Sequence, residues 1–184
     1  LQGSMAGYLL AVVAYVQSGL SFTPTQAAVT LLPFSLGAFT GASISVPRDR
    51  RLGKVAMFVG AVSQAVSIWW AVVIVHDHGP DLTIWHLAPA PLLGGAGVGL
   101  VVAPLIDVAM ATVPLPDAGA ASGAYGATQQ IGAAIGVAVT GVVFVNAAGA
   151  DLSQPSAVQG ITAASWVVVA GYTLCALATM LLPS

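Results

Sequence analysis

The sequence is built from long apolar runs that are almost free of charge. Only 5% of its 184 residues are Asp, Glu, Lys or Arg, whereas 58% are hydrophobic, and the mean hydropathy is +0.95. A soluble domain carries about 25% charged residues, so this chain has too few to cover a water-facing surface. Lipid must therefore be the solvent for most of the chain. The net charge of −2 also argues against a nucleic-acid partner.

The apolar runs predict helices rather than strands. Each run stays apolar on all sides for about 20 residues, whereas a membrane-spanning strand alternates between lipid-facing and lumen-facing residues. The expected fold is all-α: a single six-helix transmembrane bundle over residues 1–184. The predicted helices cover residues 5–20, 24–46, 54–75, 84–112, 118–148 and 161–182.

Local signals mark some of the helix ends. Thr23 has the character of an N-cap, and Pro24 that of a first helical residue. Pro89, Pro91 and Pro104 are expected to interrupt the fourth helix. The chain starts inside an apolar run without an initial Met, and we therefore expect a fragment of a longer protein.

The charges predict an orientation in the cell membrane. The basic residues are Arg48, Arg50, Arg51 and Lys54. Since all of them fall in one loop, the positive-inside rule predicts that residues 48–54 are cytoplasmic in a multi-pass plasma-membrane protein. Alternation then places residues 76–83 outside. The tryptophans, which favour membrane interfaces, lie near the predicted outer helix ends: Trp69, Trp70, Trp85 and Trp166.

Glycine is the most informative residue type inside the predicted helices. Glycines four residues apart share a helix face and let helix backbones approach closely in lipid. The expected packing pairs are Gly37/Gly41, Gly119/Gly123 and Gly132/Gly136. The GGAGVG stretch supplies cavity or gate candidates, namely Gly94, Gly97 and Gly99. Plain helix packing and packing that lets helices rock both remain open for these positions.

Polar residues within the predicted spans are the other candidates. Gln129 and Gln130 lie near mid-membrane, and Gln17 lies near the outer end of the first helix. A polar pair at that depth is costly unless it meets a cavity or a partner helix, so cavity lining and an interhelical hydrogen bond both remain open. Asp107 is the one acid well inside a predicted helix, and an ion pair with the basic loop is favoured over a proton-carrying role.

No enzyme or metal site is predicted. His76 and His78 are two residues apart in an HDH sequence, but a third metal ligand is not evident nearby. No Ser–His–Asp set or paired carboxylates argue for hydrolysis.

Three stretches together resemble the fourteen-helix drug:proton antiporters of the major facilitator superfamily. The first is QSGLSFTPTQAAVTLLPFSLG, which is similar to that group's turn and following helix in the C-terminal half. The others are GAGVGLVVAPLIDVAMATVP and DAGAASGAYGATQQIGAAIGVAVTG. In the last stretch, Gly126 and Gln129 stand where the group has Asn and Arg. PRDRRLGK resembles a degenerate form of the superfamily's basic loop, in which Arg50 replaces the usual Asp.

The resemblance implies the C-terminal half of a secondary transporter. It implies proton-coupled efflux of drugs or other small amphipathic molecules, no cofactor besides the proton as coupling ion, and a missing N-terminal half as partner. The first and fourth helices would line the cavity, the second and fifth would face the other half, and the third and sixth would face lipid. Asp107 would form a cytoplasmic latch with Lys54 or Arg51. The alternatives are a non-transporting six-helix module or a homodimeric subunit, with a membrane-embedded enzyme a distant third.

The orientation can be tested by single-cysteine labelling in a Cys175→Ala background. A cysteine at position 78 should react with a membrane-impermeant thiol reagent in intact cells, and one at position 51 only after lysis, because the basic loop is expected inside. Labelling of position 78 only after lysis would overturn the orientation.

Overall fold

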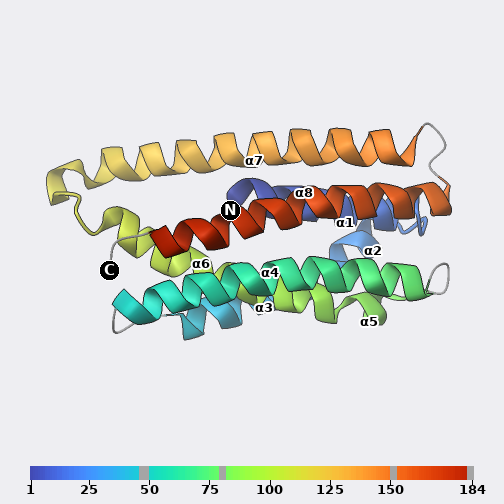
Figure 1. Cartoon of the computed structure of the whole chain (residues 1–184), viewed down its shortest axis with the longest axis horizontal. Helices are drawn as coiled ribbons and strands as arrows, with labels where there is room; N and C mark the ends of the chain where they lie inside the picture. The colour runs from blue at the N-terminus through green and yellow to red at the C-terminus, as the bar shows by residue number, and fades with distance from the viewer. Residues whose placement is uncertain (46–49, 79–81, 150–152, 182–184) are drawn as a thin grey trace.

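The computed structural model describes residues 1–45, 50–78, 82–149 and 153–181, and helices occupy most of these ranges, with no strand among them. Six helical segments run side by side along a common direction (Figure 1). Their bounds are α1 (Gln2–Ser18), α2 (Pro24–Thr30) with α3 (Leu32–Ile44), α4 (Arg50–His78), α5 (Ile84–Leu87) with α6 (Pro89–Met110), α7 (Ala118–Ala148) and α8 (Gln154–Leu181). A short 3-10 turn, η2 (Leu115–Asp117), precedes α7.

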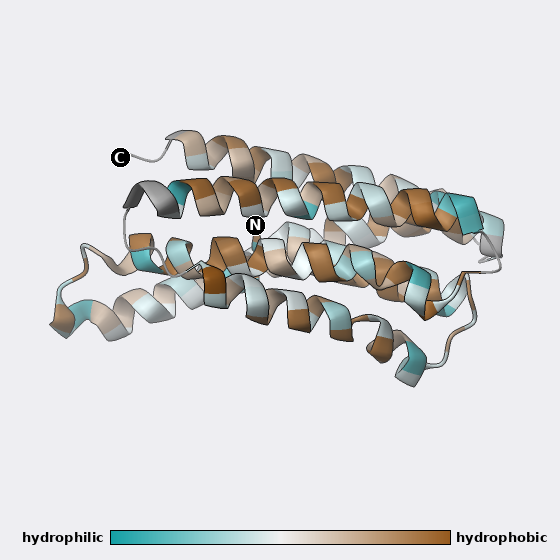
Figure 2. Cartoon of the chain, turned by 90° about the horizontal axis from the view of Figure 1, so that it is seen from below, coloured by the Kyte–Doolittle hydropathy of each residue, from teal (hydrophilic) through white to brown (hydrophobic). Residues whose placement is uncertain are grey.

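The segments have the length and composition of membrane spans. Within the described ranges, five are long and apolar enough to cross a membrane: 24–44, 53–78, 84–110, 115–148 and 155–180. α1 has 17 residues, about 26 Å, just under a hydrocarbon thickness of about 30 Å. Most of the strongly hydrophilic positions lie toward the helix ends (Figure 2). This pattern confirms the predicted all-α membrane fold. We call the two ends of the bundle the Lys54 end and the His78 end.

Prolines divide two of the six segments. The second segment breaks at Leu31, between α2 and α3, because Pro33 lacks a backbone N–H and its ring clashes with the preceding turn. The fourth breaks at Ala88, immediately before Pro89. Pro91 and Pro104, which were expected to interrupt the fourth helix as well, instead lie inside an unbroken α6.

Two helices are longer than the sequence predicts. α4 begins at Arg50 and ends at His78, so residues 50–54 are helical and not part of a loop, while Arg48 lies outside the described residues. α8 begins at Gln154, seven residues before the predicted start at 161. A proline in the first helical turn is compatible with helix geometry, and Pro155 occupies that turn. The Ala157 N–H donates to the Ser153 carbonyl at 2.9 Å.

The predicted N-cap at Thr23 is confirmed. The Thr23 hydroxyl accepts from the Gln26 N–H at 3.3 Å, and the Gln26 side-chain oxygen accepts from the Thr23 N–H at 2.9 Å. This reciprocal pair is a capping box, which satisfies two backbone donors that a helix start leaves open. Asp117 also holds an N-cap position, on α7, but its side chain makes no capping hydrogen bond.

The segments pack with an internal two-fold relation. α3 packs on α6, and α1 packs on α7. α4 also packs on α6, α8 also packs on α1, and α4 and α8 contact each other. Exchanging the first three segments with the last three maps these contacts onto one another, whereas the contact between α7 and α8 has no counterpart of similar size between α3 and α4 in the described part of the chain. The odd-numbered segments run opposite to the even-numbered ones, so the relation is an inverted repeat of the kind found within halves of transporter folds.

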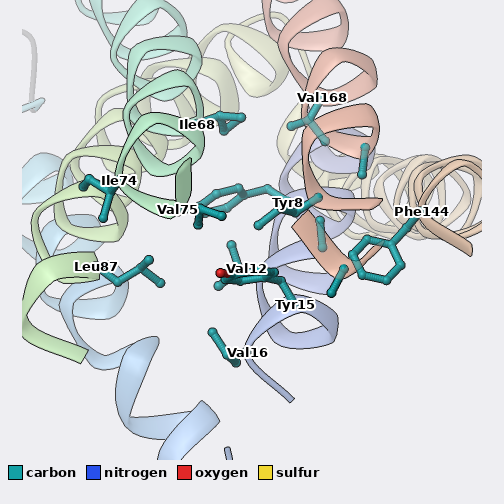
Figure 3. Packing of buried hydrophobic residues seen from close by; sticks show 14 of the residues in the cluster. Tyr8, Val12, Tyr15, Val16, Ile68, Ile74, Val75, Leu87, Phe144 and Val168 are labelled. Carbon is teal, nitrogen blue, oxygen red and sulfur yellow. The ribbon is translucent and has the colours of Figure 1, made fainter. Parts of the chain in front are cut away.

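A hydrophobic core joins the segments where α1, α4 and α8 converge. Tyr8, Val12 and Tyr15 extend from α1 into this cluster, facing residues of α4 such as Ile68 and Val75 (Figure 3). α7 and α8 close its other side with residues that include Phe144 and Val168. α1 is therefore a central helix of the bundle, as is α6, its equivalent under the internal two-fold.

Candidate functional site

The α3–α6 contact is made by glycines from both helices. Gly37 and Gly41 of α3 are buried, as are Gly95 and Gly99 of α6. A Cβ added at Gly37 would collide with the Leu92 backbone, and one added at Gly41 with the Ala96 backbone. Residue numbers rise together along the contact, so the helices are parallel. The structure thus places the predicted pair Gly37/Gly41 in close backbone contact with α6.

The α1–α7 contact is the equivalent of this one under the internal two-fold. A Cβ at Gly136 would collide with the Gly3 backbone, and one at Gly7 with the Thr140 side chain. Gly132 lies at the start of the contact, where an added Cβ would be 3.9 Å from the Gly3 nitrogen. Both parallel pairs therefore depend on small residues spaced four apart on each helix.

The remaining glycines of α6 face α4. An added Cβ at Gly97 would lie 2.5 Å from the Gly60 carbonyl oxygen, and one at Gly94 would lie 2.7 Å from the Ser67 hydroxyl. Gly99 faces α3. The cavity or gate candidates predicted from the sequence are thus buried in helix contacts of α6: Gly94 and Gly97 against α4, and Gly99 against α3. α6 is therefore closely packed on two faces.

The first half of α7 is different, because nothing described packs on its glycines. An added Cβ at Gly119, Gly123 or Gly126 would meet no atom within 4 Å. α1 reaches α7 only at the level of Gly132, so the part of α7 nearer the Lys54 end extends past α1 (Figure 1). The spacing of Gly119 and Gly123 suits helix packing, but no described residue packs on this face.

The glutamine candidates do not come together. Gly7 lies level with Thr140, so Gln17 is displaced from Gln130 by roughly 30 Å along the parallel helices α1 and α7. Gln17 and Gln130 are exposed, and Gln129 is half-buried. Any cavity lined by Gln129 and Gln130 would therefore not include Gln17 at the same depth.

Asp107 and Lys54 lie at the same level of the bundle. Ser67 of α4 faces Gly94 of α6, and the two helices are antiparallel. Lys54 lies 13 residues before Ser67, and Asp107 lies 13 residues after Gly94. Asp107 is nevertheless exposed, and within the described ranges its carboxylate has no ion-pair partner in this conformation. The side chain of Arg51 lies outside what the structure describes.

Several polar contacts were not predicted from the sequence. The Ser67 hydroxyl donates to the Ala90 carbonyl oxygen at 2.6 Å and ties α4 to α6. The rings of His78 and His86 lie with their centroids 4.3 Å apart, across the connection from α4 to α5. Within the described residues no group of three or more His, Cys, Asp or Glu side chains could hold a metal ion. No local pattern in the sequence predicts these contacts, because each joins residues of different helices.

Known proteins with similar sequences are transporters and resistance proteins. The chain is 34% identical to the "probable actinorhodin transporter" of Streptomyces coelicolor over 148 residues, which is 80% of this chain and 26% of that protein. It is 31% identical to a puromycin resistance protein of Streptomyces alboniger over 179 residues, 94% of this chain and 34% of that protein. An MFS-type transporter of Mycobacterium tuberculosis is 28% identical over 158 residues, 85% of this chain. No family model matches the sequence.

The inverted repeat of apolar helices defines a polytopic membrane protein of the transporter class. With these relatives, the chain belongs to the major facilitator superfamily, in the group of drug and antibiotic transporters, and its bundle is half of that fold. The chain spans about a quarter to a third of the length of these two Streptomyces relatives. Their names also agree with the expectation that the chain is not an enzyme.

The glycine contacts predict that Gly→Ala substitutions have opposite effects on stability at a packed position and at an open one. Gly99→Ala should destabilise the bundle by about 1–3 kcal/mol, because its Cβ meets α3 backbone. Gly123→Ala should stabilise it by about 0.5–1 kcal/mol, since its position inside α7 is open and alanine favours helix. Thermal unfolding in detergent measures both. Equal stability of Gly99→Ala and the unmodified chain would contradict the packing described here.

Proposed function

We propose that this chain is the C-terminal half of a proton-coupled efflux transporter for drugs or other small amphipathic molecules. The relatives named as a transporter and as a resistance protein support efflux. Transporters of this class bind their substrate near the midplane, between two halves that rock. No cofactor is proposed, and the proton is the coupling ion by resemblance alone.

The observation that carries the proposal is the exposure of two helices related by the internal two-fold. Only 22% of the α2–α3 span and 17% of the α7 span are buried, against 33–44% for the spans of α4, α5–α6 and α8. These are the second and fifth segments, the ones expected to face the other half. They expose large apolar side chains, among them Leu36, Phe39, Ile131 and Ile135, each at least 60% exposed. A missing N-terminal half would cover such faces.

The open glycines of α7 support the same partner. Gly119 and Gly123 share a face that meets nothing within 4 Å, and small residues at this spacing suit a close-packed helix. Gln130 is exposed and lies near the middle of α7, where a transporter cavity would supply the polar surroundings that it needs. We propose that this part of α7 lines the boundary between the two halves.

The proposed orientation places the Lys54 end in the cytoplasm and the protein in the plasma membrane. It rests on the basic residues gathered around the start of α4. We propose that the missing half carries the proton-coupling acids, because Asp107 lies near one end of α6 and, among the described residues, no acid lies near the middle of a span.

Expression of this chain alone should give no drug resistance, because the cavity needs both halves. The same chain preceded by its upstream coding sequence should give resistance. The assay is the minimal inhibitory concentration of puromycin and tetracycline in an efflux-deficient host, with membrane insertion of both forms checked by immunoblot. Resistance conferred by the chain alone would instead indicate that two copies pair through the exposed faces of α3 and α7.

The latch between Asp107 and Lys54 is a further part of the proposal. An anion near a helix C-terminus is disfavoured by the helix dipole and is costly in a membrane without a cation or water, and Lys54 lies at the same level. We expect the two side chains to pair in one conformation of the cycle. Asp107→Lys and Lys54→Asp should each lower ethidium efflux by the full-length protein about tenfold, a loss of 1.4 kcal/mol, and the double swap should restore it.

Asp107→Asn keeps the size of the side chain and removes its charge, so it serves as the control for packing. Normal efflux by this variant would show that Asp107 is only a solvated residue at the membrane boundary.

A further inference from the structure

A buried polar cluster lies at the centre of the bundle, where five of the six segments meet. It occupies a small pocket lined by Tyr8 of α1, Phe34 of α3, Gln64, Ser67 and Ile68 of α4, Gly94 of α6, and Tyr172 of α8. Tyr8 is 4% exposed and Gln64 is 1% exposed. Neither the proposed latch nor the open face of α7 uses these residues.

Two polar atoms of this pocket lack a hydrogen-bond partner in the described part of the chain. They are the Tyr8 hydroxyl and the Gln64 side-chain oxygen. The Gln64 amide nitrogen donates to the Gly60 carbonyl oxygen at 3.4 Å, and the Ser67 hydroxyl donates to Ala90. No hydrogen bond of standard geometry reaches the Tyr8 hydroxyl or the Gln64 oxygen, although the Ser67 hydroxyl oxygen lies beside Tyr8 as a competing acceptor. Buried polar groups are rarely left unpaired, so such a pair calls for an explanation.

The pocket is too tight for water to satisfy these groups. It has no volume for a water-sized molecule, and a buried water needs such space as well as two or more polar partners. The Tyr8 hydroxyl can donate, and the Gln64 oxygen can accept only. The simplest way to pair both is a hydrogen bond between them.

The helices that carry these residues, α1 and α4, meet through side chains and not through a close backbone contact. α1 makes its close backbone contacts with α7, through Gly3 and Gly7, and packs also on α8. α1 reaches the α4 face through side chains, and Tyr8 is one of the longest of them (Figure 3). A small shift of α1 against α4 can therefore make or break a Tyr8–Gln64 contact without disturbing the glycine contacts.

We propose that Tyr8 and Gln64 form a conformational switch within this half. The Tyr8 hydroxyl donates to the Gln64 side-chain oxygen in a second arrangement of α1 and α4, and the bond is open in the arrangement described here. The assignment of the second arrangement to a step of transport rests on the proposed function, whereas the hydrogen bond itself does not. Each arrangement is a discrete state of the bundle, whose population the bond biases.

A double-mutant cycle tests the bond, and α1 supplies its own control. Tyr8→Phe removes the donor, and Gln64→Met removes the acceptor with little change in volume. Tyr15→Phe is the control, because Tyr15 is fully buried on the same helix and its hydroxyl also lacks a partner, yet it does not line the pocket. The readout is the Tm of the detergent-purified full-length protein. Coupled residues give non-additive changes, and independent residues give additive ones.

We expect the Tm changes of Tyr8→Phe and Gln64→Met to depart from additivity by about 1–2 °C, while those of Tyr15→Phe and Gln64→Met add. Additive changes in both cycles, or equal departures in both, would overturn the switch. If Gln64→Met does not fold, Ser67→Ala replaces it in a second cycle that tests whether the neighbouring hydroxyl is the acceptor. Coupling to Ser67 alone would also overturn the assignment to Gln64.

Transport distinguishes failure of the switch from failure of the proposed function. In proteoliposomes, Tyr8→Phe should slow ethidium transport about threefold and Tyr15→Phe should leave it unchanged. If the unmodified protein transports no ethidium and confers no resistance, the proposed function fails, and the thermal cycle still decides whether the bond exists. Unchanged transport with a coupled thermal cycle would overturn the switch as a step of transport and leave the bond as a static contact.

Discussion

Close approach of helix backbones is the constraint on which the rest of this bundle depends. In lipid, an apolar side chain gains little free energy when it moves from lipid tails to another helix, because both environments are apolar. Helices therefore associate through van der Waals packing and interhelical hydrogen bonds. Glycines on both helices make such packing possible between α3 and α6 and between α1 and α7. α6 lies between α3 and α4 in one three-helix set, and α1 lies between α7 and α8 in the other. Contact between α4 and α8 joins the two sets.

The sequence predicted the class of fold, and the reason is that lipid imposes it. A chain with 5% charged residues and apolar runs of this length has few alternatives to a helical bundle. The Thr23 cap followed from a local motif. The break at Leu31 differs from the predicted helix 24–46, because Pro33 lies within an otherwise apolar run. The start of α8 at Gln154 differs from the prediction because the first turns of α8 are polar.

The candidate site was less predictable, because helical spacing tells which residues share a face but not what meets that face. Gly132/Gly136 and Gly119/Gly123 have the same spacing, yet one pair meets α1 and the other meets nothing described. Tyr8 and Gln64 gave no local signal at all. Their relation depends on how α1 and α4 pack, which pairwise spacing along one helix cannot reveal. The uses predicted for Gln17, Gln129 and Asp107 remain predictions.

The pairing of α1 has a consequence for how such a protein is made. Gly3 and Gly7 find their partners, Gly136 and Thr140, near the other end of the chain, whereas α3, α4 and α6 meet within a short stretch of sequence. During synthesis, α1 therefore enters the membrane long before α7 and α8, which cover the side of α1 away from α4, exist. The set formed by α3, α4 and α6 can assemble first, and the arrival of α7 and α8 is what captures α1. A helix that is central in the finished bundle is thus among the last to be secured.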